Sequence, residues 1–340
     1  MVGIGIVGVG YWGPNLVRSF LSLPDCGPVR VCDAKPGRLQ YIQQQFPPVE
    51  VTSSYDDLLT DPRLDAICIV TPVSTHKDLA LRALDSGRHV LVEKPLAPTA
   101  DQARALVDRA AARSRILAVG HLFVYHPGIV YLRDQVAAGQ LGKICSMESE
   151  RVNLGPPASE VDVVWDLGVH DVSIALYLAD QEPVEVTAFA GRYVHPSLLD
   201  MALLVIRYEG GALSHHHVSW LSPIKLRRFF AAGSAGSALF DLRQDPRSLT
   251  IYDRGFDSRI GARDDQAVEL KYGAGEVRVP ELPAAEPLMA ECRHFLECIR
   301  DGTQPRAGGL EGLRVVQVLE AAEQSIARGS AAVTLPRGSK

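Results

Sequence analysis

Glu93 and Lys94 stand side by side at the end of an apolar run and are followed by Pro95. Two opposite charges next to a buried strand are costly unless they are paired or take part in chemistry. A lysine amine that is shielded from water and lies near a positively charged ring is suited to proton transfer. A solvated surface pair is the equally open alternative.

A second cluster spans Trp165–Asp171 and contains Asp166 and His170. These two residues are four positions apart, so on a helix their side chains share one face. A histidine that a carboxylate orients is a common general acid and base. The alternatives are a polar helix start, with Asp166 near the N-cap, and a metal site. No third ligand has helical spacing with the pair, which argues against a metal.

The run His215–His217 has the residue type of a metal site but not its geometry. In a strand, alternate side chains point to opposite faces, so three consecutive histidines cannot converge on one ion. We therefore predict no metal there. Lys225, Arg227 and Arg228 follow closely, and they either bring positive charge to an anionic substrate or lie on an exposed strand.

A turn of the form GxGxxG follows the first apolar run, and Pro14 occupies the first helical position after it. Such a turn lets the backbone approach a pyrophosphate, while the helix N-terminus supplies N–H groups and a positive dipole. Proline is harmless at that position because the N–H it lacks has no helical partner. A tight turn without a ligand is the alternative. The residues assigned to the ligand here are Gly8, Gly10, Tyr11, Trp12 and Gly13.

Asp33 ends the second apolar strand, twenty residues after Gly13. At this position a carboxylate accepts hydrogen bonds from the ribose hydroxyls of the adenosine and repels a 2′-phosphate. Asp33 therefore favours NAD over NADP, although Lys35 and Arg38 lie close enough in sequence to offset this in part. A helix N-cap or a surface aspartate is the alternative.

The next apolar strand ends at Thr71 and Pro72, and a helix that includes His76 opens directly after it. Ligands of open α/β sheets lie at the carboxyl ends of the strands. Thr71, Pro72 and His76 are therefore also assigned to the cofactor, together with Glu93 and Lys94. Taken singly, the nearby hydroxyl residues are equally well explained as helix N-caps and His76 as a surface residue.

The first 120 residues alternate short apolar strands with amphipathic helices. This alternation predicts a parallel sheet that is covered on both faces, and right-handed crossovers make it doubly wound. The predicted strands are Ile4–Gly8, Val29–Asp33, Ala66–Thr71, His89–Glu93 and Ile116–Gly120. The predicted helices are Asn15–Leu23, Gly37–Phe46, Thr75–Ser86 and Thr99–Ala112.

The pattern changes after Gly120 to consecutive strands on short turns, which is typical of an antiparallel sheet. We therefore predict an α/β protein of two domains, 1–121 and 122–340, in which the last helices, 287–328, are able to pack back on the first domain. The polar stretch Ile260–Pro283 is expected at the surface. The other predicted elements are helices Gly128–Ala138, Trp165–Leu178, Pro287–Arg300 and Leu310–Arg328, strand Lys143–Asn153, strands within Val184–Tyr252, and the Gly155–Ser159 connection.

The composition excludes several classes of protein. The chain of 340 residues has a net charge of −5 and 46% hydrophobic residues, which offers no basic field for nucleic acid or a membrane surface. No stretch reaches the roughly 20 apolar residues of a membrane span, and Met1 leads into a strand rather than a secretory signal. Six scattered cysteines, with Cys32 and Cys68 inside apolar strands, favour buried thiols and a reducing, cytoplasmic setting.

Together these motifs resemble the Gfo/Idh/MocA family of glucose–fructose oxidoreductase and inositol dehydrogenase. The resemblance implies an N-terminal Rossmann domain and a C-terminal α/β domain for substrate and oligomerisation, built on an open, mostly antiparallel sheet that often mediates homodimers or homotetramers. It implies that Lys94 touches both the cofactor and a substrate hydroxyl, that His170 is the acid/base, and that Asp166 binds substrate. It also implies a cis Lys94–Pro95 bond. The motifs that carry it are Gly8–Gly13, Asp33, Thr71–His76, Gly87–Pro95, Gly120–His121 and Asp166–Asp171.

Further motifs are similar to those of sugar and sugar-nucleotide dehydrogenases within that family, namely Gly10–Asn15, Arg151–Gly155, Trp165–Leu167 and Ser219–Leu221. The expected reaction is hydride transfer between NAD and a secondary alcohol or ketone of a sugar, sugar nucleotide or cyclitol. Two alternatives remain open: a non-catalytic, NAD-binding regulatory protein, and an NAD-dependent hydrolase that recycles its cofactor. The residues assigned to the substrate are Tyr125, Arg151, Asn153, Trp165 and Lys225.

Overall fold

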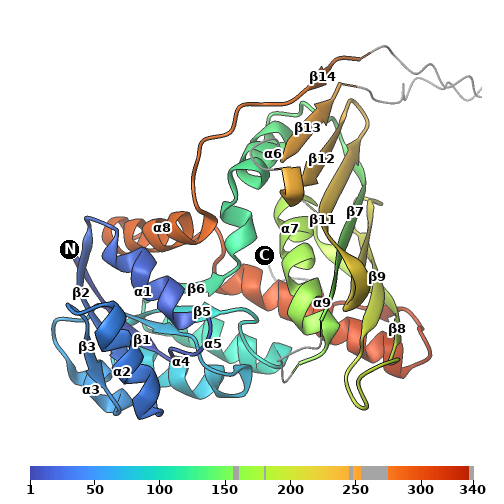
Figure 1. Cartoon of the computed structure of the whole chain (residues 1–340). Helices are drawn as coiled ribbons and strands as arrows, with labels where there is room; N and C mark the ends of the chain where they lie inside the picture. Colours follow the sequence, from blue (N-terminus) through green and yellow to red (C-terminus); the bar gives the residue numbers. More distant parts are fainter. Residues whose placement is uncertain (156–160, 180, 245–247, 254–274, 337–340) are drawn as a thin grey trace, which may run out of the picture. The chain divides into compact units, whose positions relative to one another are not determined.

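A computed structural model describes residues 1–155, 161–179, 181–244, 248–253 and 275–336. The chain divides into two units (Figure 1). The first consists of Met1–His126 and Ala285–Gln317, and the second of Pro127–Ala284 and Val318–Lys340. Most of the Gly155–Ser159 connection and most of the Ile260–Pro283 stretch lie outside the described residues.

The first unit is built on a parallel sheet of six strands in the order β3-β2-β1-β4-β5-β6. The order reverses between β1 and β4, so the sheet is doubly wound, as predicted, and helices lie on both of its faces (Figure 1). Its strands are β1 Val2–Val7, β2 Cys26–Cys32, β3 Glu50–Thr52, β4 Ala66–Ile69, β5 His89–Glu93 and β6 Leu117–Gly120. Its helices are α1 Gly13–Leu21, α2 Pro36–Gln45, α3 Tyr55–Thr60, α4 His76–Asp85, α5 Ala100–Ala112 and α8 Pro287–Asp301, with short 3-10 turns η1 Val73–Thr75 and η2 Leu122–Tyr125.

The apolar runs explain these strands, because β1 and β4 are buried along their whole length between two helical layers. The predicted strands and helices are present, with ends that shift by up to three residues. Apart from the 3-10 turns, two short elements of this unit were not predicted, β3 and α3. Each has six residues or fewer and is largely polar, so neither carries a hydrophobic period long enough to detect.

Helix α8 comes from the C-terminal part of the chain but packs against α1 and β1 in the first unit. Its residues Leu288, Cys292 and Phe295 join the same apolar core as Phe20 of α1. An ion pair between Arg18 and Glu286 ties the start of α8 to α1. The chain therefore returns to the first unit at Ala285, after most of the second unit.

The second unit is built on a nine-stranded sheet in the order β14-β13-β12-β11-β7-β10-β9-β8-β15. Among the described strand pairs of this second sheet, only β7–β10 is parallel, which confirms the prediction of a mostly antiparallel sheet. Its strands are β7 Ile144–Leu154, β8 Pro183–Gly191, β9 Met201–Tyr208, β10 Leu213–Ser219, β11 Leu221–Gly233, β12 Ser237–Asp241, β13 Leu249–Tyr252, β14 Val277–Arg278 and β15 Val333–Thr334. Its helices are α6 Pro127–Ala137 and α7 Val169–Ala179, with a 3-10 turn η4 Leu242–Gln244. Helix α9, Gly309–Ala327, has residues in both units.

One face of this sheet is covered and the other is open. Helix α7 packs against β7 and β10, and α6 packs against β12 and α7.

The helix expected over Trp165–Leu178 starts as a π-helical turn, η3 Val164–Gly168, which continues directly into α7. Asp166 lies in that turn and His170 is the second residue of α7.

All six cysteines lie in the described part of the chain, and all are free thiols. Cys32 and Cys68 are buried in their strands, as predicted. Burial raises the pKa of the Cys32 thiol to about 11, and the charge of Asp33 adds to this. In the described part of the chain, no helix combines the length and apolar character that a membrane crossing needs.

Candidate active site

The three glycines of the turn after β1 have different reasons to lack a side chain. At Gly8, where φ is +90°, a Cβ would lie 2.6 Å from the carbonyl oxygen of Val70, and at Gly13 it would lie 2.5 Å from that of Gly8. At Gly10 the nearest protein atom to a Cβ is a guanidinium nitrogen of Arg38, at 3.6 Å. Protein packing therefore requires Gly8 and Gly13, whereas Gly10 leaves room for a phosphate group in front of the α1 N-terminus. This turn fits the pyrophosphate of a dinucleotide.

Asp33 follows β2 and connects this strand to the glycine turn. Its Oδ2 accepts a hydrogen bond from the backbone N–H of Val9 at 2.9 Å, and its Oδ1 accepts one from the N–H of Lys35 at 2.8 Å. The guanidinium of Arg38 lies 3.3 Å from Oδ2. The side chain is only 5% exposed. Through its hydrogen bonds it holds the glycine turn in place, and it lies at the position predicted to bind the ribose hydroxyls.

The side chains that flank the predicted cofactor path differ in their exposure and in their contacts with the protein. Tyr11 is 95% exposed, whereas Trp12 packs against the apolar core. The Thr71 and Thr75 hydroxyls lie 2.7 Å apart. The contacts of Tyr11 and Trp12 with a cofactor, like those of Thr71 and Pro72, stay predictions.

His76 links the ends of β4 and β5. One ring nitrogen lies 2.9 Å from the carbonyl oxygen of Pro95, and the other lies 2.9 Å from that of Thr71. Burial lowers the pKa of His76, and the two carbonyl contacts act in the opposite direction. The ring is only 1% exposed, so it positions the segment around Lys94 rather than lying at the surface.

The Lys94–Pro95 bond is cis, as the resemblance implied. Next to it, the Glu93 carboxylate accepts a hydrogen bond from the backbone N–H of Lys94 at 3.2 Å. A Cβ on Gly120 of the neighbouring strand would lie 2.8 Å from Glu93 Oε2, so the two strands meet closely here. Burial raises the pKa of Glu93 to about 7, although Lys94 and the Trp12 side chain act to lower it.

A second buried carboxyl lies in the same unit, on α8. Glu291 is 2% exposed, and neither of its carboxyl oxygens has a hydrogen-bond partner among the described residues. Burial raises its pKa well above the usual range, and the charge of Glu93 adds to this. Burial therefore favours the neutral, protonated form of this carboxyl.

Asp166 and His170 remain one helical turn apart, although the turn between them is π-helical at its start. Both side chains are half-buried. The Ser173 hydroxyl donates to the His170 carbonyl at 2.7 Å, which anchors this turn of α7. The pair thus has the spacing that the sequence predicted, within the second unit.

Most side chains assigned to the substrate have partners inside the protein. In the buried pair between Arg151 and Asp171, Nε and Nη2 donate to one carboxylate oxygen at 2.9 and 2.8 Å. Trp165 Nε1 donates to Glu323 at 2.6 Å, and Asn153 Oδ1 accepts from Arg227 at 2.6 Å. In the first unit, the Tyr125 hydroxyl accepts from the N–H of Ala307 at 3.4 Å, and in the second Lys225 is exposed on β11. Their roles toward a substrate stay predictions.

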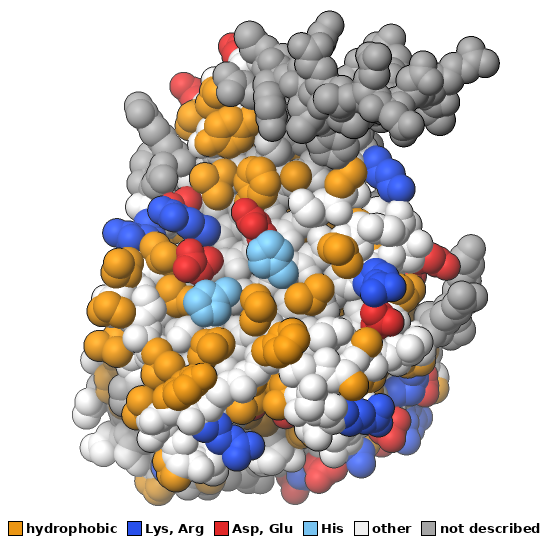
Figure 2. All heavy atoms as spheres, turned by 90° about the vertical axis from the view of Figure 1, so that its right-hand side faces the viewer, with side chains coloured by type: hydrophobic (Ala, Val, Ile, Leu, Met, Phe, Trp, Pro, Cys, Tyr) orange, Lys and Arg blue, Asp and Glu red, His pale blue; other side chains and the backbone are white. Residues whose placement is uncertain are grey.

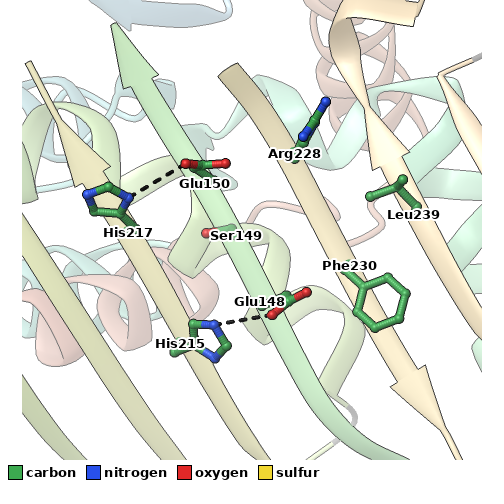
Figure 3. A pocket seen from close by; sticks show the side chains of 8 residues that line it. All are labelled: Glu148, Ser149, Glu150, His215, His217, Arg228, Phe230 and Leu239. Carbon is green, nitrogen blue, oxygen red and sulfur yellow. Dashed lines mark ion pairs between the residues drawn. The ribbon is translucent and has the colours of Figure 1, made fainter. Parts of the chain in front are cut away.

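The histidine run lies on β10 and alternates between the two sheet faces, as predicted. His216 is fully buried, with its ring nitrogens 2.8 Å from the Ser149 hydroxyl and 2.9 Å from the Ser214 hydroxyl. His215 and His217 point to the open face, where they pair with Glu148 at 3.3 Å and Glu150 at 3.8 Å (Figure 3). Within the ranges that the structure describes, no group of three or more histidine, cysteine or acidic side chains is arranged to hold a metal.

These outward pairs line a pocket of about 390 Å³ on the open sheet face (Figure 3). The pocket belongs to the second unit alone and lies on the face away from α7, which carries His170. Its lining residues are Glu148, Ser149, Glu150, His215, His217, Arg228, Phe230 and Leu239.

Two buried polar residues of the first unit received no role from the sequence, His121, which belongs to the Gly120–His121 motif, and Glu291. His121 directly follows β6, so the rule that ligands lie at the carboxyl ends of strands could have selected it. Glu291 lies three positions after Leu288 and four before Phe295. A carboxylate within an apolar helical stripe was therefore visible in the sequence.

The glycine turn, Asp33 and the doubly wound sheet define a Rossmann protein that binds a dinucleotide. Comparison with known proteins is more specific. Residues 2–121 match the model of an oxidoreductase family with an NAD-binding Rossmann fold, and residues 129–239 match the Gfo/Idh/MocA C-terminal domain. The chain belongs to the Gfo/Idh/MocA oxidoreductase family, and its cofactor is NAD.

Several characterised relatives cover nearly the whole chain. The UDP-N-acetylglucosamine 3-dehydrogenase of Acidithiobacillus ferrooxidans is 30% identical, over 92% of this chain and 93% of its own. A solved structure of that enzyme matches with a TM-score of 0.83 and 28% identity, covering 96% of this chain and 98% of its own. The NAD-dependent scyllo-inositol 2-dehydrogenase of Bacillus subtilis is 26% identical, over 97% of this chain and 94% of its own.

Proposed function

We propose that this protein transfers hydride between NAD and a secondary alcohol or ketone of a sugar, sugar nucleotide or cyclitol. One observation carries the proposal: the glycine turn and Lys94 lie at the same carboxyl edge of one parallel sheet. A ligand that binds the turn therefore extends along the edge that presents Lys94. The relatives named above act on a nucleotide sugar and on a cyclitol, which supports this substrate class.

The residues divide the work of alcohol oxidation in the following way. NAD held by the glycine turn and Asp33 would supply the acceptor for the hydride of the carbinol carbon, and NADH would supply the donor in the reverse direction. Lys94 donates a hydrogen bond to the reacting oxygen and fixes its position. His170 takes the hydroxyl proton, and Asp166, one turn earlier, holds the imidazole or the sugar in orientation. The alcohol thus loses one hydride and one proton, and the ketone results.

The test is turnover on a panel of sugars, sugar nucleotides and cyclitols, followed by NADH absorbance. We expect Lys94→Ala and His170→Ala each to lower kcat by roughly 10²- to 10⁴-fold, while NADH still binds. Lys143→Ala, which removes an exposed lysine at the start of β7, is the matched control. Near-normal turnover in both site variants would contradict the assignment. NADH binding with no turnover would indicate a regulatory protein, and product without NADH would indicate internal recycling of the cofactor.

We also propose that a second copy of this chain packs on the open face of the nine-stranded sheet. The strand register aligns outward side chains in two rows across the sheet. One row is Thr187, Val205, His215, Glu148, Phe230 and Leu239, and the other is Phe189, Leu203, His217, Glu150 and Arg228. Figure 2 shows that hydrophobic side chains surround the histidines and acidic groups on this side of the molecule. A face that combines apolar side chains with charges of both signs can pair with itself about a two-fold axis.

Sedimentation equilibrium tests the second copy. Leu203→Arg places a charge in the middle of the face and is expected to lower the observed mass to that of one chain. Leu310→Arg introduces the same charge at an exposed position of α9 and is the control. A wild-type protein that sediments as a single chain would contradict the proposal.

A cytoplasmic, reducing location is proposed on the basis of the thiols. All six cysteines are free, and four of them are buried in strands or helices. Thiols in such positions persist where disulfide formation is not favoured. Fractionation of cells with an antibody to the protein tests the location directly.

A further inference from the structure

The order of strands assigns a direction to the bound dinucleotide. The glycine turn that fits the pyrophosphate follows β1, and Asp33, the ribose ligand of the adenosine half, follows β2. On the other side of β1 the sheet continues with β4, β5 and β6. The nicotinamide half therefore extends toward the carboxyl ends of these three strands.

His121 lies at the far part of that edge. Glu93 of β5 pairs in register with Gly120 of β6, so Lys94 and His121 are the next residues of two neighbouring parallel strands. The absence of a side chain at Gly120 lets the strand ends approach, since a Cβ there would meet the Glu93 carboxylate at 2.8 Å. His121 thus lies at the strand end next to Lys94, the residue that we propose donates a hydrogen bond to the reacting oxygen of the substrate.

The His121 ring has an unusual hydrogen-bonding state for this protein. It is 2% exposed, and neither ring nitrogen has a hydrogen-bond partner in the described part of the chain. By contrast, His76 and His216 are equally buried and each has a polar partner at both ring nitrogens. Buried polar atoms without partners are rare in folded proteins and often mark the position of a ligand or a catalytic group.

We propose that His121 binds the nicotinamide half of NAD, through the carboxamide or a hydroxyl of the adjacent ribose. A neutral imidazole offers one donor and one acceptor, and both groups of the ligand can match it. Nothing else in the first unit gives this ring a partner among the described residues. This inference depends on the NAD site and not on which sugar is oxidised.

The charge state of the ring supports a binding role rather than acid/base catalysis. Burial lowers the pKa of His121 to about 3, and the positive charge of Lys94 contributes in the same direction. The ring is therefore neutral throughout the working pH range, and proton transfer is left to other groups.

The test compares NADH with ADP-ribose, which contains the adenosine half but no nicotinamide. His121→Phe keeps the ring shape and removes both polar nitrogens. It is expected to raise the Kd of NADH about tenfold, the effect of one lost buried hydrogen bond, and to leave the Kd of ADP-ribose unchanged. His121→Asn and His121→Gln restore a polar atom near Nδ1 and near Nε2, respectively. Recovery in one of them identifies the nitrogen that binds.

His216→Phe is the matched control, because it removes a buried imidazole whose two nitrogens have partners. It is expected to lower the Tm and to leave NADH affinity unchanged, whereas His121→Phe should not lower the Tm of the free protein. An unchanged NADH Kd in His121→Phe would overturn the proposal, and so would an equal loss for NADH and ADP-ribose. Turnover of wild-type protein on the sugar panel is measured separately, so failure of the proposed function remains distinguishable from failure of this inference.

Discussion

The carboxyl edge of the six-stranded sheet and the covered face of the nine-stranded sheet both contain buried polar side chains, but these differ in their partners. In the second unit, Arg151 pairs with Asp171 and His216 lies between two serine hydroxyls. In the first unit, His121 and Glu291 have no hydrogen-bond partner among the described residues. Buried polar groups that pair with each other stabilise a fold, whereas unpaired ones cost stability. His121 and Glu291 thus cost the first unit stability on the side where a ligand is expected, whereas Arg151 and His216 of the second unit have partners within the protein.

The largest effect should come from breaking a buried pair of the second unit. Asp171→Asn leaves the Arg151 guanidinium buried opposite an uncharged amide, and both side chains are at most 5% exposed. We expect the free energy of unfolding to fall by about 3–5 kcal/mol, measured by urea denaturation.

The control for this variant is an ion pair at the surface. Asp253→Asn removes the partner of Arg278 at the edge of the same sheet, where both side chains are exposed. Exposed pairs contribute little to stability, so no measurable change in the urea midpoint is expected. An equal loss of unfolding free energy in Asp171→Asn and Asp253→Asn would mean that burial does not make the Arg151–Asp171 pair more important than a surface pair.

A smaller effect of opposite sign is expected in the first unit, from Glu291→Gln. The folded-state pKa of Glu291 is raised by burial above its usual value of 4.5. The folded protein therefore keeps a proton that the unfolded chain releases, and this group makes the protein less stable as pH rises above about 4.5, by at most about 1.4 kcal/mol per pH unit. The glutamine variant lacks this loss. Its stability relative to wild type should increase as pH rises above about 4.5, measured by urea denaturation at several pH values.

Glu286→Gln gives the opposite sign on the same helix. A hydrogen bond from Arg18 lowers the pKa of Glu286, so this carboxylate stabilises the fold above its unfolded pKa and loses that contribution as pH falls. The Glu286→Gln variant should therefore become less stable relative to wild type as pH rises. Parallel pH trends in the two variants would show that Glu291 is paired in solution.

The sequence predicted those parts of the fold that depend on local pattern. The parallel strands are short apolar runs, and β5 has the predicted bounds, His89–Glu93. The glycine turn was predicted because its spacing stands between an apolar strand and a helix, and the steric requirement at Gly8 and Gly13 is now seen directly. The outward and inward alternation of His215–His217 follows from strand geometry in the same way.

What the sequence did not give depends on contacts between distant residues. Arg151 and Asp171 are twenty positions apart, and their pairing requires β7 and α7 to pack together. Arg151 was assigned to the substrate from its place in the Arg151–Gly155 motif, and a single sequence does not show that its charge has a partner. The isolation of His121 is likewise a property of the folded core, since no local pattern says which nitrogens remain unpaired.

Asp33 lies between the two cases, because it is buried and has partners but is also assigned to a ligand. Its two oxygens hold the N–H groups of Val9 and Lys35, and a carboxylate has further acceptor capacity for ribose hydroxyls. Asp33→Asn keeps the shape but removes the charge and part of the acceptor capacity. We expect the Kd of NAD to rise about tenfold, or about 1.4 kcal/mol, while the Kd of NADP changes less because the 2′-phosphate is no longer repelled. Titration calorimetry with both cofactors measures the two constants.

Asp65→Asn is the control for the turn itself, since Asp65 also accepts a hydrogen bond from a backbone N–H of β1, at Gly3, but at the amino end of the sheet. It should leave both cofactor affinities unchanged. If Asp33→Asn weakens the binding of NAD and of NADP equally, Asp33 acts only by holding the glycine turn. Its role is then structural, like that of the buried Arg151–Asp171 pair. If Asp33→Asn instead lowers the preference for NAD over NADP, Asp33 also binds the ligand. The carboxyl edge of the first sheet would then have a ligand-binding polar residue after β2, as we propose for His121 after β6.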